Sequence, residues 1–178
     1  LNPPPQEDKN GDIVIRDEAK GKSVTLTGEI KTDIEAFTAQ NFKVNTQQLL
    51  RAVEPHLTGN TLKKVFLIGS EGEKGSFVML ETVRTMLSRY GANLDISLHG
   101  KEKHGIRFED VDSLRNEYEK LVQEAKRNYL EDDIILDVTG GQKTASIAAA
   151  MTTFSNSNLK FQYVETMGDK PQVLSFNI

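Results

Sequence analysis

One run of residues in this chain has an order that suits the binding of an anion. Residues 133–143 read Asp-Ile-Ile-Leu-Asp-Val-Thr-Gly-Gly-Gln-Lys, and a small-residue run from Thr144 to Ala150 follows at once. Glycine permits a positive φ or a close approach to the backbone, and the free N–H groups at the start of a helix favour negative charge. Thr139, Lys143 and Thr144 add hydroxyls and an ammonium. The pattern predicts a strand, a turn the size of a phosphate and the N-terminus of a helix.

A second loop with suitable chemistry follows another apolar run. Residues 69–76 read Gly-Ser-Glu-Gly-Glu-Lys-Gly-Ser and come directly after the run Lys-Val-Phe-Leu-Ile at 64–68. Ligands of open α/β sheets bind outside the carboxyl ends of the strands. We therefore expect the two loops to surround one pocket, provided that their strands are central and adjacent. The predicted ligand-binding residues are Gly69, Ser70, Glu71, Lys74, Ser76, Thr139, Gly140, Gly141, Gln142, Lys143 and Thr144.

Each loop, taken alone, is also typical of a tight connection between a strand and a helix. In that interpretation Ser70 caps a helix and Lys143 is a solvated lysine. Two such loops at neighbouring strand ends favour a ligand site over two unrelated turns. Asp137 is interpreted as a hydrogen-bond acceptor that fixes the turn at Thr139, and not as a catalytic acid. His99 ends a predicted strand but has no identified partner, so it is not assigned to the site.

The elements that position these loops follow a regular alternation that begins at residue 63. This order predicts an α/β fold with a Rossmann-like, doubly wound, mostly parallel sheet and an edge strand. Small side chains at 145–150 suit a subunit contact and internal packing equally well. The predicted strands are 64–69, 94–99, 134–138 and 159–164, the predicted helices are 77–90, 111–129 and 143–154, and a short strand at 173–176 is expected to pair antiparallel at an edge.

The N-terminal part predicts a small addition to that sheet. Alternating residues at 13–16 and 23–30 flank a polar turn, which indicates a hairpin. A helix capped by Asn45 or Thr46 is expected to end near residues 55–59, whereas 33–42 is left unassigned. The predicted organisation is a linker at 1–11, the hairpin and helix addition at 12–62 and the Rossmann-like domain at 63–178. Because the linker is proline-rich and begins without methionine, we expect an upstream segment in a longer protein.

The composition disfavours several functional classes. The 178 residues are 37% hydrophobic and 27% charged with a net charge of -4, which is typical of a globular chain. This mild acidity argues against a surface for bulk DNA or RNA, because such binding needs clustered Lys and Arg. There is no cysteine, and His56, His99 and His104 lack the spacing of metal ligands, so we expect no metal site and no cofactor. No run of about 18 apolar residues is present to span a bilayer.

Two common nucleotide-binding motifs do not match these loops. The P-loop pattern Gly-x-x-x-x-Gly-Lys-[Ser/Thr] fails because Gln142 separates Gly141 from Lys143, and because Asp137 stands where the first glycine belongs. The loop at 69–76 has a Gly-x-x-Gly-x-x-Gly spacing in place of the dinucleotide fingerprint Gly-x-Gly-x-x-Gly. An unrelated Rossmann-like nucleotide enzyme is therefore the weaker alternative.

The same residues resemble a known family. The strand, Gly-Ser loop and helix at 64–90, together with Leu136-Asp-Val-Thr-Gly-Gly-Gln-Lys143 opening a small-residue helix, look like the CARF domain, the CRISPR-associated Rossmann fold. The resemblance covers residues 63–178, and Asp-x-Thr-Gly-Gly-x-Lys is its most specific part. It implies a homodimer that binds a cyclic oligoadenylate of type III CRISPR systems, often cyclic tetra-adenylate, across its two-fold axis.

Family members usually couple this sensor to an effector in antiviral defence. The resemblance therefore implies an effector elsewhere in the protein, and we expect an N-terminal transmembrane segment upstream of the linker. The 178 residues would then form a cytoplasmic domain, tethered to the inner membrane in the full-length protein.

Some family members also cleave their ligand slowly and act as ring nucleases. That reaction needs in-line attack by a ribose 2′-OH and stabilisation of developing negative charge. Lys143 with Ser70 or Ser76 would supply the stabilisation, but the sequence offers no evident general base. We therefore expect binding without turnover, with ring cleavage as the alternative.

Overall fold

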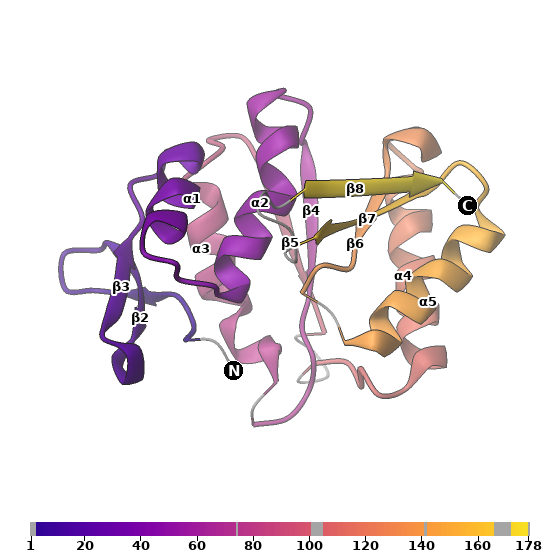
Figure 1. Cartoon of the computed structure of the whole chain (residues 1–178). Coiled ribbons are helices and arrows are strands. Elements are labelled where there is room, and N and C mark those ends of the chain that lie inside the picture. The colour runs from indigo at the N-terminus through magenta and orange to yellow at the C-terminus, as the bar shows by residue number, and fades with distance from the viewer. Residues whose placement is uncertain (1–2, 74, 101–104, 141, 166–171, 178) are drawn as a thin grey trace. The chain divides into compact units, whose positions relative to one another are not determined.

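The computed structural model describes residues 3–73, 75–100, 105–140, 142–165 and 172–177. It divides into two compact units, residues 1–105 and residues 106–178. In Figure 1 the first unit runs from indigo to magenta and rose, and the second continues from there to yellow. Each unit contains its own helices and its own β-strands.

The first unit combines a small antiparallel sheet with a pair of parallel strands. The antiparallel sheet has the order β1-β2-β3, and in its β2–β3 hairpin Val14 pairs with Thr25. The predicted hairpin is confirmed by this pairing. The predicted helix is also present, as α2, but its cap was predicted wrongly, because Val44 and not Asn45 or Thr46 is the N-cap. The strands are β1 (Gln6–Glu7), β2 (Ile13–Asp17), β3 (Lys22–Thr25), β4 (Lys64–Ile68) and β5 (Asp95–His99), and the helices are α1 (Ile30–Ala39), α2 (Asn45–Thr58) and α3 (Leu80–Ser88).

The region after β3 differs from the sequence prediction, which extended the strand to residue 30. The strand ends at Thr25, and Gly28 takes a φ of 85° that breaks the extended backbone. Glu29 then caps α1, since its carboxylate accepts hydrogen bonds from the backbone N–H groups of the first turn. The unassigned segment 33–42 lies largely in α1, which buries Ile34 and Phe37 on one face.

One apolar core joins the N-terminal elements of this unit to its parallel strands. Val65 and Leu67 of β4 and Ile96 of β5 pack against this core. In the parallel pair, Val65 lies opposite Ile96 and Ile68 lies opposite His99. The buried members of the core are Ile13, Ile15, Val24, Leu26, Ile30, Ile34, Phe37, Phe42, Val44, Leu50, Met86 and Leu87.

The second unit is a three-stranded mixed sheet with two α-helices among its described residues. Its elements are α4 (Val111–Ala125), β6 (Ile135–Asp137), α5 (Lys143–Ser155), β7 (Lys160–Glu165) and β8 (Gln172–Asn177). β6 pairs parallel with β7, which confirms the predicted crossover, and β8 pairs antiparallel with β7 as predicted for the last strand. Helix α5 packs against both β7 and α4.

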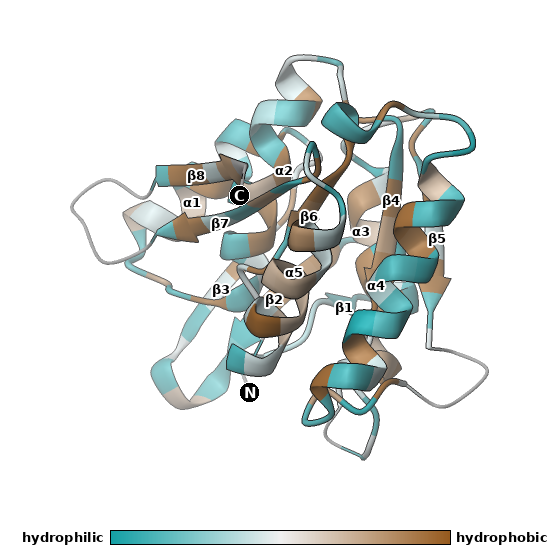
Figure 2. Cartoon of the chain, turned by 90° about the vertical axis from the view of Figure 1, so that its right-hand side faces the viewer, coloured by the Kyte–Doolittle hydropathy of each residue, from teal (hydrophilic) through white to brown (hydrophobic). Residues whose placement is uncertain are grey.

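The two helices of this unit differ in character. Helix α4 buries one face, formed by Leu114, Tyr118, Leu121, Val122 and Ala125, and Figure 2 shows teal and brown segments alternating along it. Helix α5 is mostly pale to brown in that view because small and apolar residues of the helix itself occupy most of its sides. Helix α4 ends at Ala125, earlier than the predicted residue 129, and Lys126, its C-cap, forms an ion pair with Glu131 at 2.7 Å.

The structure therefore confirms a mixed α/β fold. Its described strands form three sheets, β1-β2-β3, β4-β5 and β6-β7-β8. A single doubly wound sheet that continues from β4 to β6 stays a prediction, as does the division into a linker, an N-terminal addition and a Rossmann-like domain. Within the described ranges, no helix is both long and apolar enough to cross a membrane.

Candidate anion-binding site

The turn that follows β6 is fixed by a small hydrogen-bond network. Asp137 Oδ1 accepts from the backbone N–H of Thr139 at 3.1 Å, and Asp137 Oδ2 accepts from the Thr139 hydroxyl at 3.0 Å. Gln162 Nε2 donates to the same Oδ2 at 3.1 Å, and the backbone N–H of Val164 donates to Thr139 Oγ1 at 2.8 Å. The expected role of Asp137 as an acceptor that fixes the turn is confirmed. Since the hydroxyl proton of Thr139 is directed to Asp137, this residue supports the loop from within.

Helix α5 begins directly after this turn, and no side chain caps it. Gln142 occupies the N-cap position without a side-chain hydrogen bond to the first turn. Its carbonyl accepts from the N–H groups of Ala145 and Ser146, at 3.0 and 3.4 Å. Gln142 and Lys143 are exposed, and Lys143 forms no ion pair with any described residue. The start of α5 therefore presents backbone donors and an ammonium to solvent, an arrangement that favours an anion.

No feature of the described structure requires glycine at position 140. Its φ lies outside the positive range, and a Cβ built on it would meet no atom within 4 Å. The residue is exposed. Its backbone is therefore open to a close approach by another group, one of the two uses of glycine expected here. Gly141, also predicted to bind the ligand, lies outside the described residues.

The loop after β4 is closed by two serines that bind one another. The backbone N–H of Ser70 donates to Ser76 Oγ at 2.9 Å, and the backbone N–H of Ser76 donates to Ser70 Oγ at 2.9 Å. The two hydroxyl oxygens lie 3.2 Å apart. Glu71 is exposed, whereas Lys74 lies outside the described residues. The predicted cap by Ser70 is thus a reciprocal serine pair that holds the loop in shape.

The glycines of this loop serve close packing. A Cβ on Gly69 would lie 2.5 Å from Phe77 Cα, and a Cβ on Gly75 would collide with the carbonyl oxygens of Ser70 and Glu71. Gly105, which the sequence pattern did not single out, has a φ of 105° and packs against the backbone of Glu71. These contacts are the structural role expected of a tight strand-to-helix connection.

His99 lies beside the beginning of the same loop. It pairs with Ile68 in the parallel register, and its carbonyl accepts a 3.4 Å hydrogen bond from the N–H of Gly69. Its ring lies 5.3 Å from the ring of Phe66, and Lys64 Nζ lies 5.0 Å from the centre of that ring. The imidazole is thus part of an aromatic and cationic row along the parallel pair.

The predicted site residues fall into two groups, one in each compact unit. Thr139, Gly140, Gln142, Lys143 and Thr144 lie together in the second unit, around the end of β6 and the start of α5. Gly69, Ser70, Glu71 and Ser76 lie together in the first unit, around the end of β4. That the two loops surround one pocket stays a prediction.

Tyr118 is a neighbour of the site that sequence reasoning missed. It is 7% exposed on α4. Burial and, secondarily, the carboxylate of Asp137 raise the pKa of the Tyr118 phenol to about 12. The tyrosine therefore lies close enough to the end of β6 to respond to the charge of Asp137. Its helical spacing from Leu114 signals only a core position, which is why the sequence offered no sign of this proximity.

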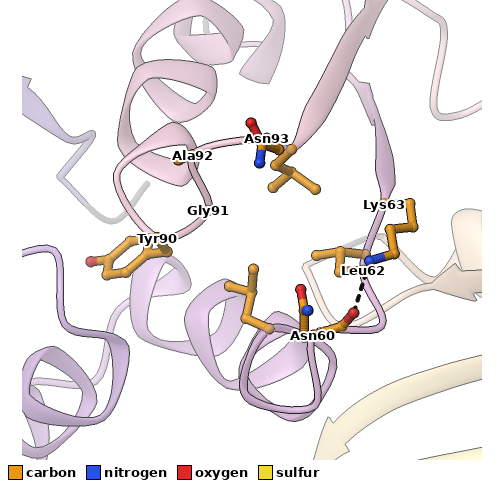
Figure 3. A pocket seen from close by; sticks show the side chains of 9 residues that line it. Asn60, Leu62, Lys63, Tyr90, Gly91, Ala92 and Asn93 are labelled. Carbon is orange, nitrogen blue, oxygen red and sulfur yellow. Dashed lines mark hydrogen bonds between the residues drawn. The ribbon is translucent and has the colours of Figure 1, made fainter.

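A separate cavity of about 290 Å³ lies in the first unit, at the amino ends of β4 and β5 (Figure 3). Lys63 Nζ donates to the Asn60 carbonyl at 3.0 Å on one side, and the Tyr90 hydroxyl points away from the cavity. Its nine lining residues include neither a carboxylate nor a histidine. They are Leu57, Asn60, Leu62, Lys63, Tyr90, Gly91, Ala92, Asn93 and Leu94. Among the described residues, no group of three His, Cys, Asp or Glu side chains is placed to hold a metal ion.

Comparison with known proteins finds a relative of this chain but does not assign the chain to a family. No family model matches the chain. A protein of Aquifex aeolicus (strain VF5), which is named only as an uncharacterized protein, is 31% identical over 108 residues. The matched region is 60% of this chain and 33% of that protein, so the chain spans at most about a third of the relative in this alignment.

Proposed function

We propose that this protein is a sensor that binds a cyclic oligoadenylate, most suitably cyclic tetra-adenylate, and controls an effector in type III CRISPR antiviral defence. The observation that carries the proposal is the start of α5. There, the network of Asp137 and Thr139 holds an exposed turn against β7, and an uncapped helix end follows it with Lys143 free of ion pairs among the described residues. A phosphodiester is an anion that this arrangement suits.

The proposal includes a homodimer and a shared sheet. A ring of identical nucleotides has its own symmetry, and a two-fold dimer would present the loop at 139–143 once to each half of the ring. In the proposed Rossmann-like sheet the parallel pairs β4-β5 and β6-β7 are joined, so that the loop at 69–76 lies beside the loop at 139–143. Charge-assisted hydrogen bonds to phosphate contribute about 1.5 to 3 kcal/mol each. Two sets of a few donors would therefore bind the ring without the help of a basic surface.

Calorimetry with cyclic tetra-adenylate, NAD and ATP tests this function. We expect the cyclic ligand to bind at one ring per two chains and the other two to bind weakly or not at all. Lys143→Ala should weaken binding of the ring at least tenfold. The matched control is Lys120→Ala, because Lys120 is an exposed lysine of α4 whose ion pair within the described part of the chain is with Glu117, at 3.6 Å. Equal affinity of the wild-type protein for NAD would favour a nucleotide enzyme, and undiminished binding by Lys143→Ala would remove that lysine from the site.

Incubation with labelled cyclic tetra-adenylate separates a sensor from a ring nuclease. We expect the ring to be recovered intact, because neither loop presents an established general base beside its donors. A linear product that accumulates with the protein and not with Lys143→Ala would show that the same site cleaves its ligand.

A further inference from the structure

Strand β8 is the outermost strand of the sheet in the second unit. The sheet order is β6-β7-β8, so β8 pairs with β7 along one side and ends the described sheet on its other side. All six of its residues, Gln172–Asn177, lie opposite residues of β7. In the proposed Rossmann-like sheet β4 lies beside β6, so β8 stays at the edge there too. An edge strand presents unpaired N–H and C=O groups and is a template for a further strand.

The register shows which backbone groups of β8 point away from the sheet. The N–H and the C=O of one residue point to the same side of a strand, and that side alternates along the chain. The Lys160 N–H and the Gln162 C=O form hydrogen bonds with the backbone around β6, at 3.2 and 3.0 Å, so the odd-numbered residues of β7 face β8. Their partners on β8 are Gln172, Leu174 and Phe176. The outward backbone groups of β8 therefore belong to Val173, Ser175 and Asn177.

These outward groups are available to a further strand. Within the described ranges, no residue forms a hydrogen bond with the backbone of β8 on this side, and Ser175 is exposed. The neighbouring Phe176 is 41% exposed, although its ring stacks on the rings of Phe161 and Tyr163, at 5.4 and 6.3 Å. The edge thus combines open backbone groups with an aromatic ring that is only partly covered.

Strand β8 lacks the features that usually protect an edge. Natural sheets blunt their edges with very short strands, charged side chains or proline. The antiparallel sheet of the first unit does so, because β1 has two residues and β3 begins with Lys22. Strand β8 has six residues and contains neither a charged residue nor a proline. Since like charges opposite one another destabilise a strand pair, an uncharged strand is suited to lie opposite a copy of itself.

We propose that β8 pairs antiparallel with β8 of a second copy of this chain, about a two-fold axis at Ser175. Each Ser175 then exchanges both backbone hydrogen bonds with Ser175 of the partner subunit, and Val173 does the same with Asn177 of the partner subunit. Leu174 lies opposite Phe176 of the partner subunit, in a non-hydrogen-bonded pair whose side chains are close together. The pairing joins two three-stranded sheets into one and covers the exposed part of the Phe176 ring.

This contact goes beyond the two-fold contact proposed around the cyclic ligand. In the ligand-bound dimer the two copies meet at the loop 139–143, which follows β6, whereas the edge contact is made by β8, on the far side of β7. Two different two-fold contacts on one chain produce assemblies larger than a dimer. We therefore expect the ring-free protein to dimerise through β8 and the ring to convert these dimers into larger assemblies.

Sedimentation equilibrium of the whole chain, over micromolar to millimolar concentrations, tests the pairing. We expect a reversible equilibrium between monomer and dimer. Ser175→Pro removes an outward N–H without removing a hydrogen bond to β7, so it should weaken dimerisation at least tenfold. Ser175→Ala is the matched control, because it keeps that N–H, and should dimerise as the wild-type protein does. A wild-type chain that stays monomeric at every concentration would overturn the proposal, as would a dimer that Ser175→Pro leaves unchanged.

Amide hydrogen exchange of the wild-type protein gives a test that does not depend on how Ser175→Pro folds. In dilute solution the Ser175 N–H should exchange at nearly the rate of an unstructured chain, because its outward side is open. Its exchange should slow at least fivefold at the concentrations where the dimer forms. An exchange rate of Ser175 that does not change as the chain dimerises would place the contact elsewhere and refute the pairing through β8.

Cyclic tetra-adenylate added to the same samples separates this proposal from the sensor function. If the ring-free chain dimerises through β8 but the ring does not bind, the edge pairing stands and the sensor function fails. If the ring binds but the ring-free chain stays monomeric, the sensor function stands and the edge pairing is refuted. We expect the ring to bind the wild-type protein and Ser175→Pro alike, and to raise the mass of the wild-type assembly alone above that of a dimer.

Discussion

The Tyr90 hydroxyl donates a 2.7 Å hydrogen bond to Asp33 Oδ2, although 57 residues separate them in sequence. Asp33 is fully buried, and its carboxylate also accepts from the N–H and the hydroxyl of Thr27, both at 2.8 Å, and from the N–H of Gly28 at 3.1 Å. This one carboxylate therefore joins the loop before α1 to the segment after α3. Its four donors satisfy the buried carboxylate, and it forms no ion pair with a described residue.

Tyr90→Phe removes one of those donors and little volume. We expect the free energy of unfolding to fall by about 1.5 to 3 kcal/mol, the usual loss for a hydrogen bond to a charged group. Urea denaturation followed by circular dichroism measures the change. Tyr129→Phe is the matched control, because Tyr129 is half-buried and makes no side-chain hydrogen bond with a described residue. An equal loss in the two variants would show that the bond to Asp33 contributes nothing specific.

Tyr118 gives a prediction for alkaline pH. Burial, followed by the Asp137 carboxylate, raises its pKa from 10.0 to about 12, so folding favours the neutral phenol. A raised folded-state pKa contributes stability that is fully present below the unfolded pKa and is lost as the pH rises through the folded value. Between pH 10 and 12 the wild-type protein should therefore lose stability more steeply than Tyr118→Phe. Their difference should stay constant from pH 7 to 9, and a parallel decline above pH 10 would contradict the prediction.

Thr139→Val tests the network that holds the turn before α5. The substitution keeps the shape of the side chain but deprives Asp137 of a donor and Val164 N–H of its acceptor. We expect a loss of about 1 to 3 kcal/mol in the free energy of unfolding. Thr85→Val is the control, since Thr85 is exposed and its hydroxyl donates to Glu81 O in its own helix and to no other described residue. This change should alter stability by about 0.5 kcal/mol or less. A neutral Thr139→Val would mean that the turn holds its shape without the hydroxyl.

Gly75→Ala and Gly140→Ala compare a glycine that close packing requires with a glycine whose surroundings have room for a side chain. A Cβ at position 75 would collide with the carbonyl oxygens of Ser70 and Glu71, so we expect a loss of about 1 to 3 kcal/mol or more. A Cβ at position 140 meets nothing within 4 Å, so stability should stay within about 0.5 kcal/mol, while binding of cyclic tetra-adenylate should weaken at least threefold. Thermal unfolding and calorimetry provide the two measurements. If Gly140→Ala left the affinity unchanged, a close approach of the ligand to this backbone would be ruled out.

Much of the second unit could be predicted because its signals are local. The apolar run before Asp137, the two glycines and the small-residue run specified β6, a turn and α5 in order, and hydrogen bonding by Asp137 followed from its place two residues before Thr139. A side chain that bonds to the backbone two residues later belongs to a turn, and a turn is encoded by its own residues.

Other features depend on contacts that sequence spacing does not reveal. Gly105 packs against Glu71 across more than thirty residues, and its need for glycine comes from that approach. Arg115 resembles any arginine of an amphipathic helix, and its spacing gives no sign that its Nε is buried. The early end of β3 was missed for another reason: the strand-like alternation continued past Gly28, and the cap by Glu29 decided the outcome.

The shared core of the first unit has a consequence for how this sequence can be inherited. The inner positions of β4 and β5, at Val65, Leu67 and Ile96, pack against a core whose buried members come from the hairpin, α1, α2 and α3. Full burial of an apolar side chain stabilises a fold by about 1.5 to 3 kcal/mol, so a chain that began at residue 63 would lose the N-terminal part of this core and expose the rest of it to water. The hairpin is therefore no detachable module. A recombination event that transfers the loop at 69–76 to another protein would have to carry residues 13–50 with it, or supply a new apolar cover in the same step.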